Sequence, residues 1–131
     1  MKDYINKIIS IEKSLSIELG KFNLFALFER EDINDKWDIL ISIDIPLSKK
    51  NEVIERIHNE FLKELPNNFI INISRIVFLE TINPIVQNLN SIANVEHGFI
   101  EIKDLIINNL KIKNALIISS QKIAKKRNFF K

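Results

Sequence analysis

Residues 24–44 read LFALFEREDINDKWDILISID, and this stretch decides the fold. Residues 22–28 are apolar at nearly every position, which is typical of a strand that is covered on both faces. Residues 37–45 alternate instead, with Trp37 and isoleucines on one face and a semi-polar second face that carries Asp38 and Asp44. Residues 29–36 are charged and turn-forming, so the two strands are predicted to form an antiparallel hairpin with a long loop.

Two amphipathic helices are predicted on either side of this hairpin in the sequence. Residues 3–19 carry apolar side chains at helical spacing, and Gly20 follows where a helix is expected to end. The next helix is expected to be capped by Ser48 and stopped by Pro66. Its apolar stripe is Ile54, Ile57, Phe61 and Leu65.

A third helix is predicted over residues 83–95, with Asn83 as its cap and Pro84 at the first helical position. Its expected apolar face is Ile85, Val86, Leu89, Ile92 and Ala93. Three further apolar runs are predicted to be strands: residues 68–80, strongest over 73–79, then 98–107 and 114–120. The last run also suits the start of a final helix, but a strand is the favoured interpretation.

The resulting order of elements is α-β-β-α-β-α-β-β, without an internal repeat or a linker that would divide the chain. We therefore expect an α+β fold with a single mixed β-sheet of about five strands packed by three helices. Residues 1–121 are predicted to form one domain and residues 122–131 a basic, aromatic tail. The sequence does not fix the order of the strands in the sheet.

Composition narrows the possible functions. The chain has 131 residues, and 46% of them are hydrophobic, which is enough for one domain with a core. The 19 basic and 17 acidic residues give a net charge of +2, so charge alone does not favour nucleic acid or an acidic partner. The absence of cysteine excludes disulfides, thiolate metal sites and a cysteine nucleophile. Without a membrane-length apolar run or a signal-like N-terminus, we expect a cytoplasmic protein that does not enter a membrane.

A resemblance to a known family extends over residues 1–95. It rests on the order of the elements and on three segments of the sequence: LFALFERED, DKWDILISI and SRIVFLETINPIVQNL. The chain resembles the small nucleotidyltransferase domains often found beside an antitoxin or toxin partner, which implies a small bacterial-type cytosolic protein. In that family one strand ends in Gly-Ser, the next carries Asp-x-Asp, and a later strand supplies a third carboxylate. In this chain the position of the family's Gly-Ser pair is occupied by Ala26 and Leu27. The two acids of the Asp-x-Asp motif correspond to Lys36 and Asp38.

The third acid of the family falls on Ser74 or Arg75, neither of which can ligate Mg²⁺. The resemblance therefore implies a catalytically inactive scaffold without a cofactor. Glu29, Glu31 and Asp32, expected in the loop, could bend toward Asp38, and an alternative site would be built from Glu29, Asp32 and Asp38. A divalent-metal-dependent nucleotidyltransferase with Mg²⁺ at this non-standard acidic site thus remains an alternative.

Simpler interpretations of the same residues also stand. Asp38 next to Trp37 is typical of a solvated or capping acid on a half-exposed strand, and Arg75 is placed to form an ion pair with Asp38 or Asp44. His97 lies in VEHG, residues 95–98, whose residue types suit a turn before a strand as well as an acid-base pair.

The tail holds basic residues beside aromatic ones: Lys125, Lys126, Arg127, Phe129 and Phe130. Such residues can contact phosphates and stack on bases, as in a small nucleic-acid-binding protein. They can equally form a solvated tail, or anchor a protein partner or a symmetry mate. The favoured overall prediction is a non-enzymatic, self-associating interaction module that binds a protein partner through an apolar sheet face.

Overall fold

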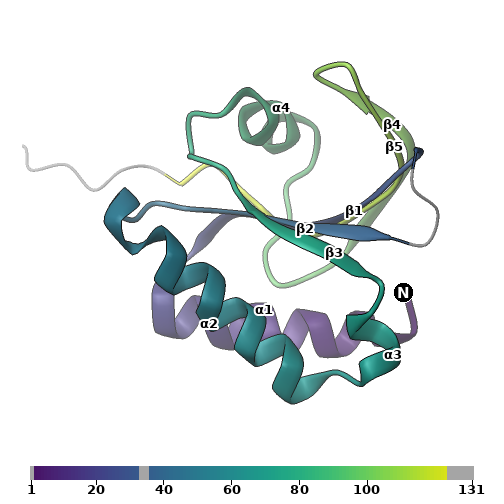
Figure 1. Ribbon diagram of the computed structural model, residues 1–131. Helices are drawn as coiled ribbons and strands as arrows, with labels where there is room; N and C mark the ends of the chain where they lie inside the picture. The colour runs from purple at the N-terminus through teal and green to yellow at the C-terminus, as the bar shows by residue number, and fades with distance from the viewer. Residues whose placement is uncertain (1, 33–35, 124–131) are drawn as a thin grey trace, which may run out of the picture.

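A computed structural model describes residues 2–32 and 36–123. It confirms the α+β fold with one mixed five-stranded sheet, whose strand order is β3-β2-β1-β5-β4. α1, α2 and α3 cover one face of the sheet and α4 covers the other (Figure 1). Apart from the short 3-10 helices Lys2–Tyr4 and Leu47–Lys49, the elements are α1 (Ile5–Leu19), β1 (Phe22–Arg30), β2 (Trp37–Ile43), α2 (Lys50–Glu64), α3 (Asn67–Ile70), β3 (Ile73–Phe78), α4 (Pro84–Ile92), β4 (Ile100–Ile107) and β5 (Leu110–Ser120).

β1 is the central strand, and it is buried from Phe22 to Glu29. Phe25 and Leu27 pack into the core under α1 and α2, whereas Leu24 and Phe28 pack into the core under α4. β1 pairs antiparallel with β2 on one side and with β5 on the other. The predicted hairpin and the covering of this strand on both faces are therefore confirmed.

The passage from β2 to β3 is a crossover through α2, so these two strands are parallel. Ile57 and Phe61 of α2 are buried against the sheet, as the apolar stripe predicted. The prediction that Ser48 caps this helix is wrong. Ser48 lies inside the 3-10 helix Leu47–Lys49, and the position before α2 is Lys49, which makes no side-chain cap bond.

The strand expected from residue 68 begins only at Ile73, because α3 takes up its first residues. The carbonyl of Pro66 accepts hydrogen bonds from the amides of Phe69 and Ile70, which closes this helical turn. The turn buries Phe69, whose ring lies 6.2 Å from that of Phe61. Burial of one aromatic side chain thus overrides the extended pattern of the sequence.

α4 begins as predicted. The Asn83 side chain accepts a hydrogen bond from the amide of Ile85 at 2.9 Å, and Pro84 occupies the first turn. Val86, Leu89 and Ala93 are buried. Ile92, expected on the same face, is 57% exposed, because only the stripe formed by the three buried residues faces the sheet.

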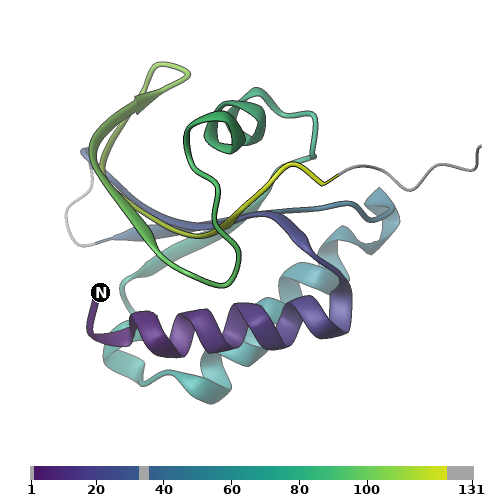
Figure 2. The ribbon, with the colours of Figure 1, turned by 180° about the vertical axis from the view of Figure 1, so that it is seen from behind.

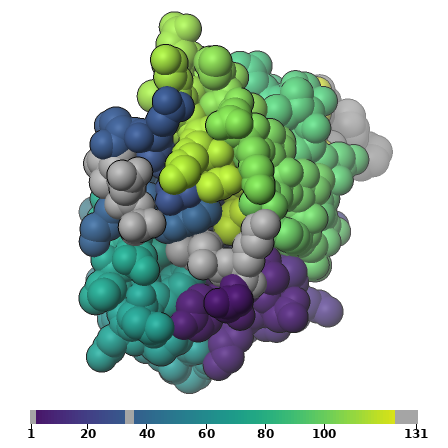
Figure 3. Space-filling view, turned by 90° about the vertical axis from the view of Figure 1, so that its right-hand side faces the viewer, coloured from purple at the N-terminus to yellow at the C-terminus, as the bar shows by residue number. Residues whose placement is uncertain are grey.

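The C-terminal part of the sheet is the hairpin of β4 and β5, which confirms strands in both predicted runs. Its turn is made by Asn108 and Asn109, both with left-handed φ angles (50° and 66°), a conformation that asparagine tolerates. Between α4 and β4 the chain passes to the α1 side of the sheet (Figure 2). Seen from the side, the hairpin (green) lies above α1 (purple) and the α2–α3 region (teal) (Figure 3).

The α4 cap provides a test of this account. We expect Asn83→Ala to lower the free energy of unfolding by about 1 kcal/mol, because the amide of Ile85 loses its acceptor. The measurement is urea unfolding followed by circular dichroism. The matched control is Asn6→Ala at an exposed position of α1, which should change stability by no more than about 0.5 kcal/mol. Equal effects of the two substitutions would contradict the capping role.

Candidate functional site

Asp38 sits in a clamp of two arginines on the α4 face of the sheet. Its side chain is 6% exposed. The guanidinium Nε of Arg30, at the end of β1, lies 3.2 Å from Asp38 Oδ2, and the Nε of Arg75, on β3, lies 3.3 Å from Asp38 Oδ1. The predicted ion pair of Arg75 with Asp38 is confirmed, whereas the interpretation of Asp38 as a solvated acid is wrong.

Strand register produces this clamp. Asp38 of β2 pairs with Phe28 of β1 and with Arg75 of β3, so its neighbours on both strands are fixed by the ladder. A buried carboxylate is costly unless it is paired and hydrogen-bonded. The two guanidiniums pair its charge and leave the cluster with one net positive charge. Arg75 Nη2 also donates a hydrogen bond to Asp38 Oδ2 at 3.4 Å, whereas the buried Oδ1 has no hydrogen-bond partner within the described residues. The arrangement stabilises a carboxylate, but it does not present that carboxylate to a metal ion or a substrate.

The other candidate acids do not join Asp38. Glu29, expected in the loop, belongs to β1 and faces the opposite side of the sheet, since it pairs with Trp37 of the α1–α2 core. Its Oε1 accepts a hydrogen bond from Asn114 Nδ2 at 2.7 Å. Asp32 is exposed in the turn, 3.9 Å from Arg30. Within the described residues, no three His, Asp or Glu side chains gather as a metal site would require.

The positions that resemble a phosphate cradle are also closed. Ala26 and Leu27 are fully buried in the middle of β1, on opposite faces of the sheet. Lys36, just before β2, donates a hydrogen bond from Nζ to the carbonyl of Ile71 at 2.6 Å. These residues therefore support the strand and its neighbours, and they offer no backbone amides to an incoming anion.

The tail residues predicted to contact nucleic acid or a partner lie outside the described part of the chain. They are Lys125, Lys126, Arg127, Phe129 and Phe130. Their role stays a prediction.

A buried acid and a histidine form a second polar cluster that the sequence interpretation missed as a pair. Glu12 of α1 is fully buried, and its Oε1 lies 2.6 Å from His97 Nδ1. The backbone of His97 has a left-handed φ of 52°, and its amide donates a hydrogen bond to the Ser119 hydroxyl at 3.0 Å. One signal was present in the sequence: Glu12 follows Ile8 by four residues and precedes Leu15 by three, which places it on the apolar stripe of the helix.

Burial controls the acidity of this cluster. Desolvation raises the pKa of the Glu12 carboxyl above its ordinary value of 4.5, and the hydrogen bond with His97 opposes only part of the shift. The contact ties the turn before β4 to α1, two segments far apart in the sequence. The raised pKa makes the contribution of Glu12 to stability depend on pH.

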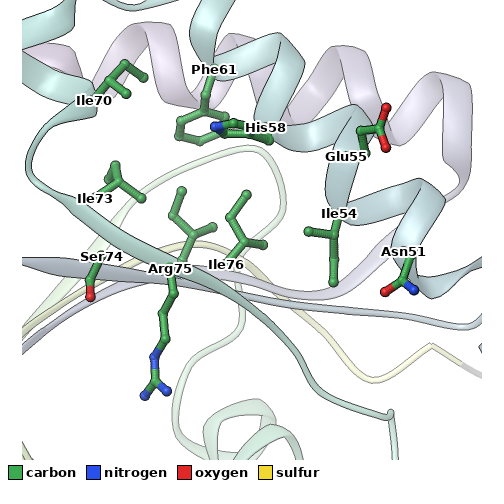
Figure 4. Close-up of a pocket in the computed structure, with 11 residues that line it drawn as sticks. Asn51, Ile54, Glu55, His58, Phe61, Ile70, Ile73, Ser74, Arg75 and Ile76 are labelled. Atoms are coloured by element: carbon green, nitrogen blue, oxygen red, sulfur yellow. The ribbon is translucent and has the colours of Figure 1, made fainter.

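An open groove lies between α2, α3 and β3, with a volume of about 510 Å³. Its floor and walls are apolar: Ile39, Ile54, Phe61, Ile70, Ile73 and Ile76. The polar part of its lining comes from α2 and β3: Asn51, Glu55, His58, Ser74 and Arg75. Ile54 and Ile76 point into the space between helix and strand (Figure 4). The Arg75 side chain points out of the groove, toward Asp38 (Figure 4). An apolar lining of this kind suits apolar side chains better than a charged substrate.

Comparison of the chain with family models, with curated proteins and with solved structures finds no match. In the part of the chain that the structure describes, no helix is both long and apolar enough to cross a membrane.

The arginine clamp predicts a clear mutational effect. We expect Asp38→Asn to lower the free energy of unfolding by about 1–3 kcal/mol, because it leaves two guanidiniums without their shared carboxylate. Chemical unfolding measures this, with the exposed Asp44→Asn as the control. A variant that equals or exceeds the wild type in stability would contradict the stabilising role of the clamp, because the desolvation cost of the carboxylate would then offset its attraction to the two guanidiniums.

The Glu12 contact predicts a dependence on pH. The pKa of Glu12 is higher in the folded state than in the unfolded state. The stabilisation that Glu12 contributes is therefore fully present below the unfolded-state pKa, and it is lost as the pH rises through the folded-state pKa. We expect the free energy of unfolding of the wild type, relative to Glu12→Gln, to fall over that interval. Urea unfolding from about pH 4 to pH 8 measures the difference. A difference that rises with pH would contradict the assignment. The exposed Glu31→Gln is the control, expected to stay within about 0.5 kcal/mol of the wild type.

Proposed function

We propose that this chain is a nucleotidyltransferase-like scaffold without catalytic residues, which acts in the cytoplasm as a protein-interaction domain. The observation that carries the proposal is the clamp of Arg30 and Arg75 on Asp38. Arg75 stands where the family resemblance expects a third carboxylate. A cation at that position replaces a metal ligand with a group that repels metals, while it satisfies the charge of Asp38.

The enzyme alternative receives little support from the positions of its acids. Glu29 and Asp38 lie on opposite faces of the sheet, and Asp32 is exposed beside Arg30. A two-metal or one-metal site needs carboxylates that converge on one ion. Binding of nucleic acid through the tail rests on residues outside the described ranges.

The groove and the strand beside it support protein binding. β3 pairs with β2 on one side, and among the described strands it has no neighbour on the other. Protein partners commonly add a strand to such an edge, and apolar side chains of the partner fill the adjoining pockets. Exposed Leu62 and Ile71 add apolar surface on α2 and just before β3.

The deciding experiment is a thermal-shift titration with Mg²⁺ or Mn²⁺ and each of the common nucleoside triphosphates. A ligand at a hundredfold excess over its Kd stabilises the folded state by about 2.7 kcal/mol, which shifts Tm measurably. We expect no metal-dependent shift at millimolar nucleotide. A shift that needs the metal and disappears in Asp38→Asn would overturn the proposal and restore the enzyme alternative. Samples with chelator and with nucleotide alone separate metal binding from nucleotide binding.

A further inference from the structure

The segment just before β4 contains an irregularity that directs His97 toward α1. Val95 and Ile100 are five residues apart, but the residues with which they pair on β5, Ser120 and Ile117, are only three apart. The extra residues form a bulge, and bulges commonly redirect a side chain. His97 lies inside the bulge with a left-handed φ of 52°, a conformation that costs free energy in a residue other than glycine. The fold therefore carries a local cost that holds His97 in place.

The two ring nitrogens of His97 have different surroundings. Nδ1 lies 2.6 Å from Oε1 of Glu12, which is fully buried. When Glu12 is ionised, it accepts the proton of Nδ1 and leaves the lone pair of the ring on Nε2. Nε2 forms no hydrogen bond within the described residues, and Oε2 of Glu96 lies 3.7 Å from it. The side chain of His97 is 27% exposed, so this lone pair is within reach of solutes.

We propose that His97 Nε2 and the Glu96 carboxylate bind a divalent transition-metal ion of the Zn²⁺ type, with Glu12 as the buried group that orients the histidine. This inference goes beyond the proposed function and does not rest on it. Histidines that ligate a metal almost always donate their other ring N–H to a carboxylate, a carbonyl or water. The contact of His97 with Glu12 has this arrangement.

The spacing of the two ligands suits such an ion. Imidazole nitrogens and carboxylate oxygens bind Zn²⁺ at about 2.0–2.2 Å, which places two ligands of a tetrahedral ion roughly 3.3 Å apart. The 3.7 Å between Nε2 and Oε2 closes to this spacing with a small rotation of the Glu96 side chain, which is 37% exposed. Within the described residues no third His, Asp or Glu side chain joins these two as a ligand, so water completes the coordination.

The charges around the site also favour a cation. Glu96 Oε2 accepts a hydrogen bond from Gln121 Nε2 at 3.3 Å and lies 3.8 Å from Lys21 Nζ. Lys21 is 64% exposed, so its ammonium can return to water when a divalent ion takes its place. A buried carboxylate such as Glu12 is costly without a counter-charge, and an ion bound to the far side of the imidazole supplies one.

Calorimetric titration of the full chain with Zn²⁺ near neutral pH tests the proposal. We expect one ion per chain, and a loss of affinity of about tenfold or more in Glu96→Gln and in His97→Asn, where asparagine tolerates the left-handed backbone. The chain has two histidines, so His58→Asn, at an exposed position of α2, is the matched control and should bind Zn²⁺ like the wild type. Cooperative unfolding of each variant shows that the fold is intact.

The role of Glu12 as a positioning residue has its own measurement. We expect Glu12→Gln to weaken Zn²⁺ binding by about 10–100-fold, because the amide does not supply the negative charge that orients the ring and raises its basicity. Nitrogen NMR of the imidazole rings provides a readout that a purely structural role would not change. Zn²⁺ should shift the Nε2 resonance of His97 in the wild type and leave both resonances of His58 unchanged.

The outcomes decide the proposal without reference to the nucleotide experiment. A wild type that does not bind Zn²⁺, or binding that persists in His97→Asn or falls equally in His58→Asn, overturns the site. Binding in Glu12→Gln that equals the wild type overturns the orienting role of Glu12. Asp38→Asn, far from this cluster in the sheet register, should bind Zn²⁺ like the wild type. Failure of the Zn²⁺ site therefore leaves the proposed scaffold function to its own test.

Discussion

The burial of β1 on both faces is the constraint on which the rest of the structure depends. A strand that is apolar on both sides needs a helical layer above it and another below, and its backbone groups need a strand on each edge. α1 and α2 supply one layer, α4 the other, and β2 and β5 the two edges. Polar residues enter β1 only near its ends, at Asn23, Glu29 and Arg30. The side chains of Glu29 and Arg30 find partners in Asn114 and Asp38, whereas the buried Asn23 Oδ1 has no hydrogen-bond partner within the described residues.

The signs of the charges in the clamp on Asp38 decide what this part of the sheet can do. Three neighbouring strands bring three side chains together on the α4 face of the sheet. Three carboxylates in such an arrangement would need a cation from solution, whereas one carboxylate between two guanidiniums carries its counter-charges within the chain. The same strand geometry can therefore serve catalysis or stability, and the identities of residues 30 and 75 favour stability. The interaction role proposed above then falls to the parts of the surface that the core leaves open.

The sequence predicted what depends on local periodicity and missed what depends on distant packing. The hairpin, α1, α2 and the cap of α4 follow from spacing and from residues such as Asn83 and Pro84. The α3 turn does not, because its stability comes from Phe69 reaching Phe61 in the core. The strand order, the contact of Glu12 with His97 and the burial of Asp38 all require segments far apart in the chain to meet. The groove was also missed, since it exists only once β3 lies beside α2.

The position of β5 has a consequence for how the chain reaches its native state. β5 is the last strand in chain order, yet it occupies the place next to the central strand, and residue 24 pairs with residue 120. One edge of the most apolar strand therefore stays open until nearly the whole described chain is available. Pairing between segments so far apart in the chain slows folding, and until it occurs the partly folded chain exposes an apolar strand edge that is prone to aggregation. The exposed apolar edge is therefore the part of the incompletely folded chain at which aggregation is expected to begin.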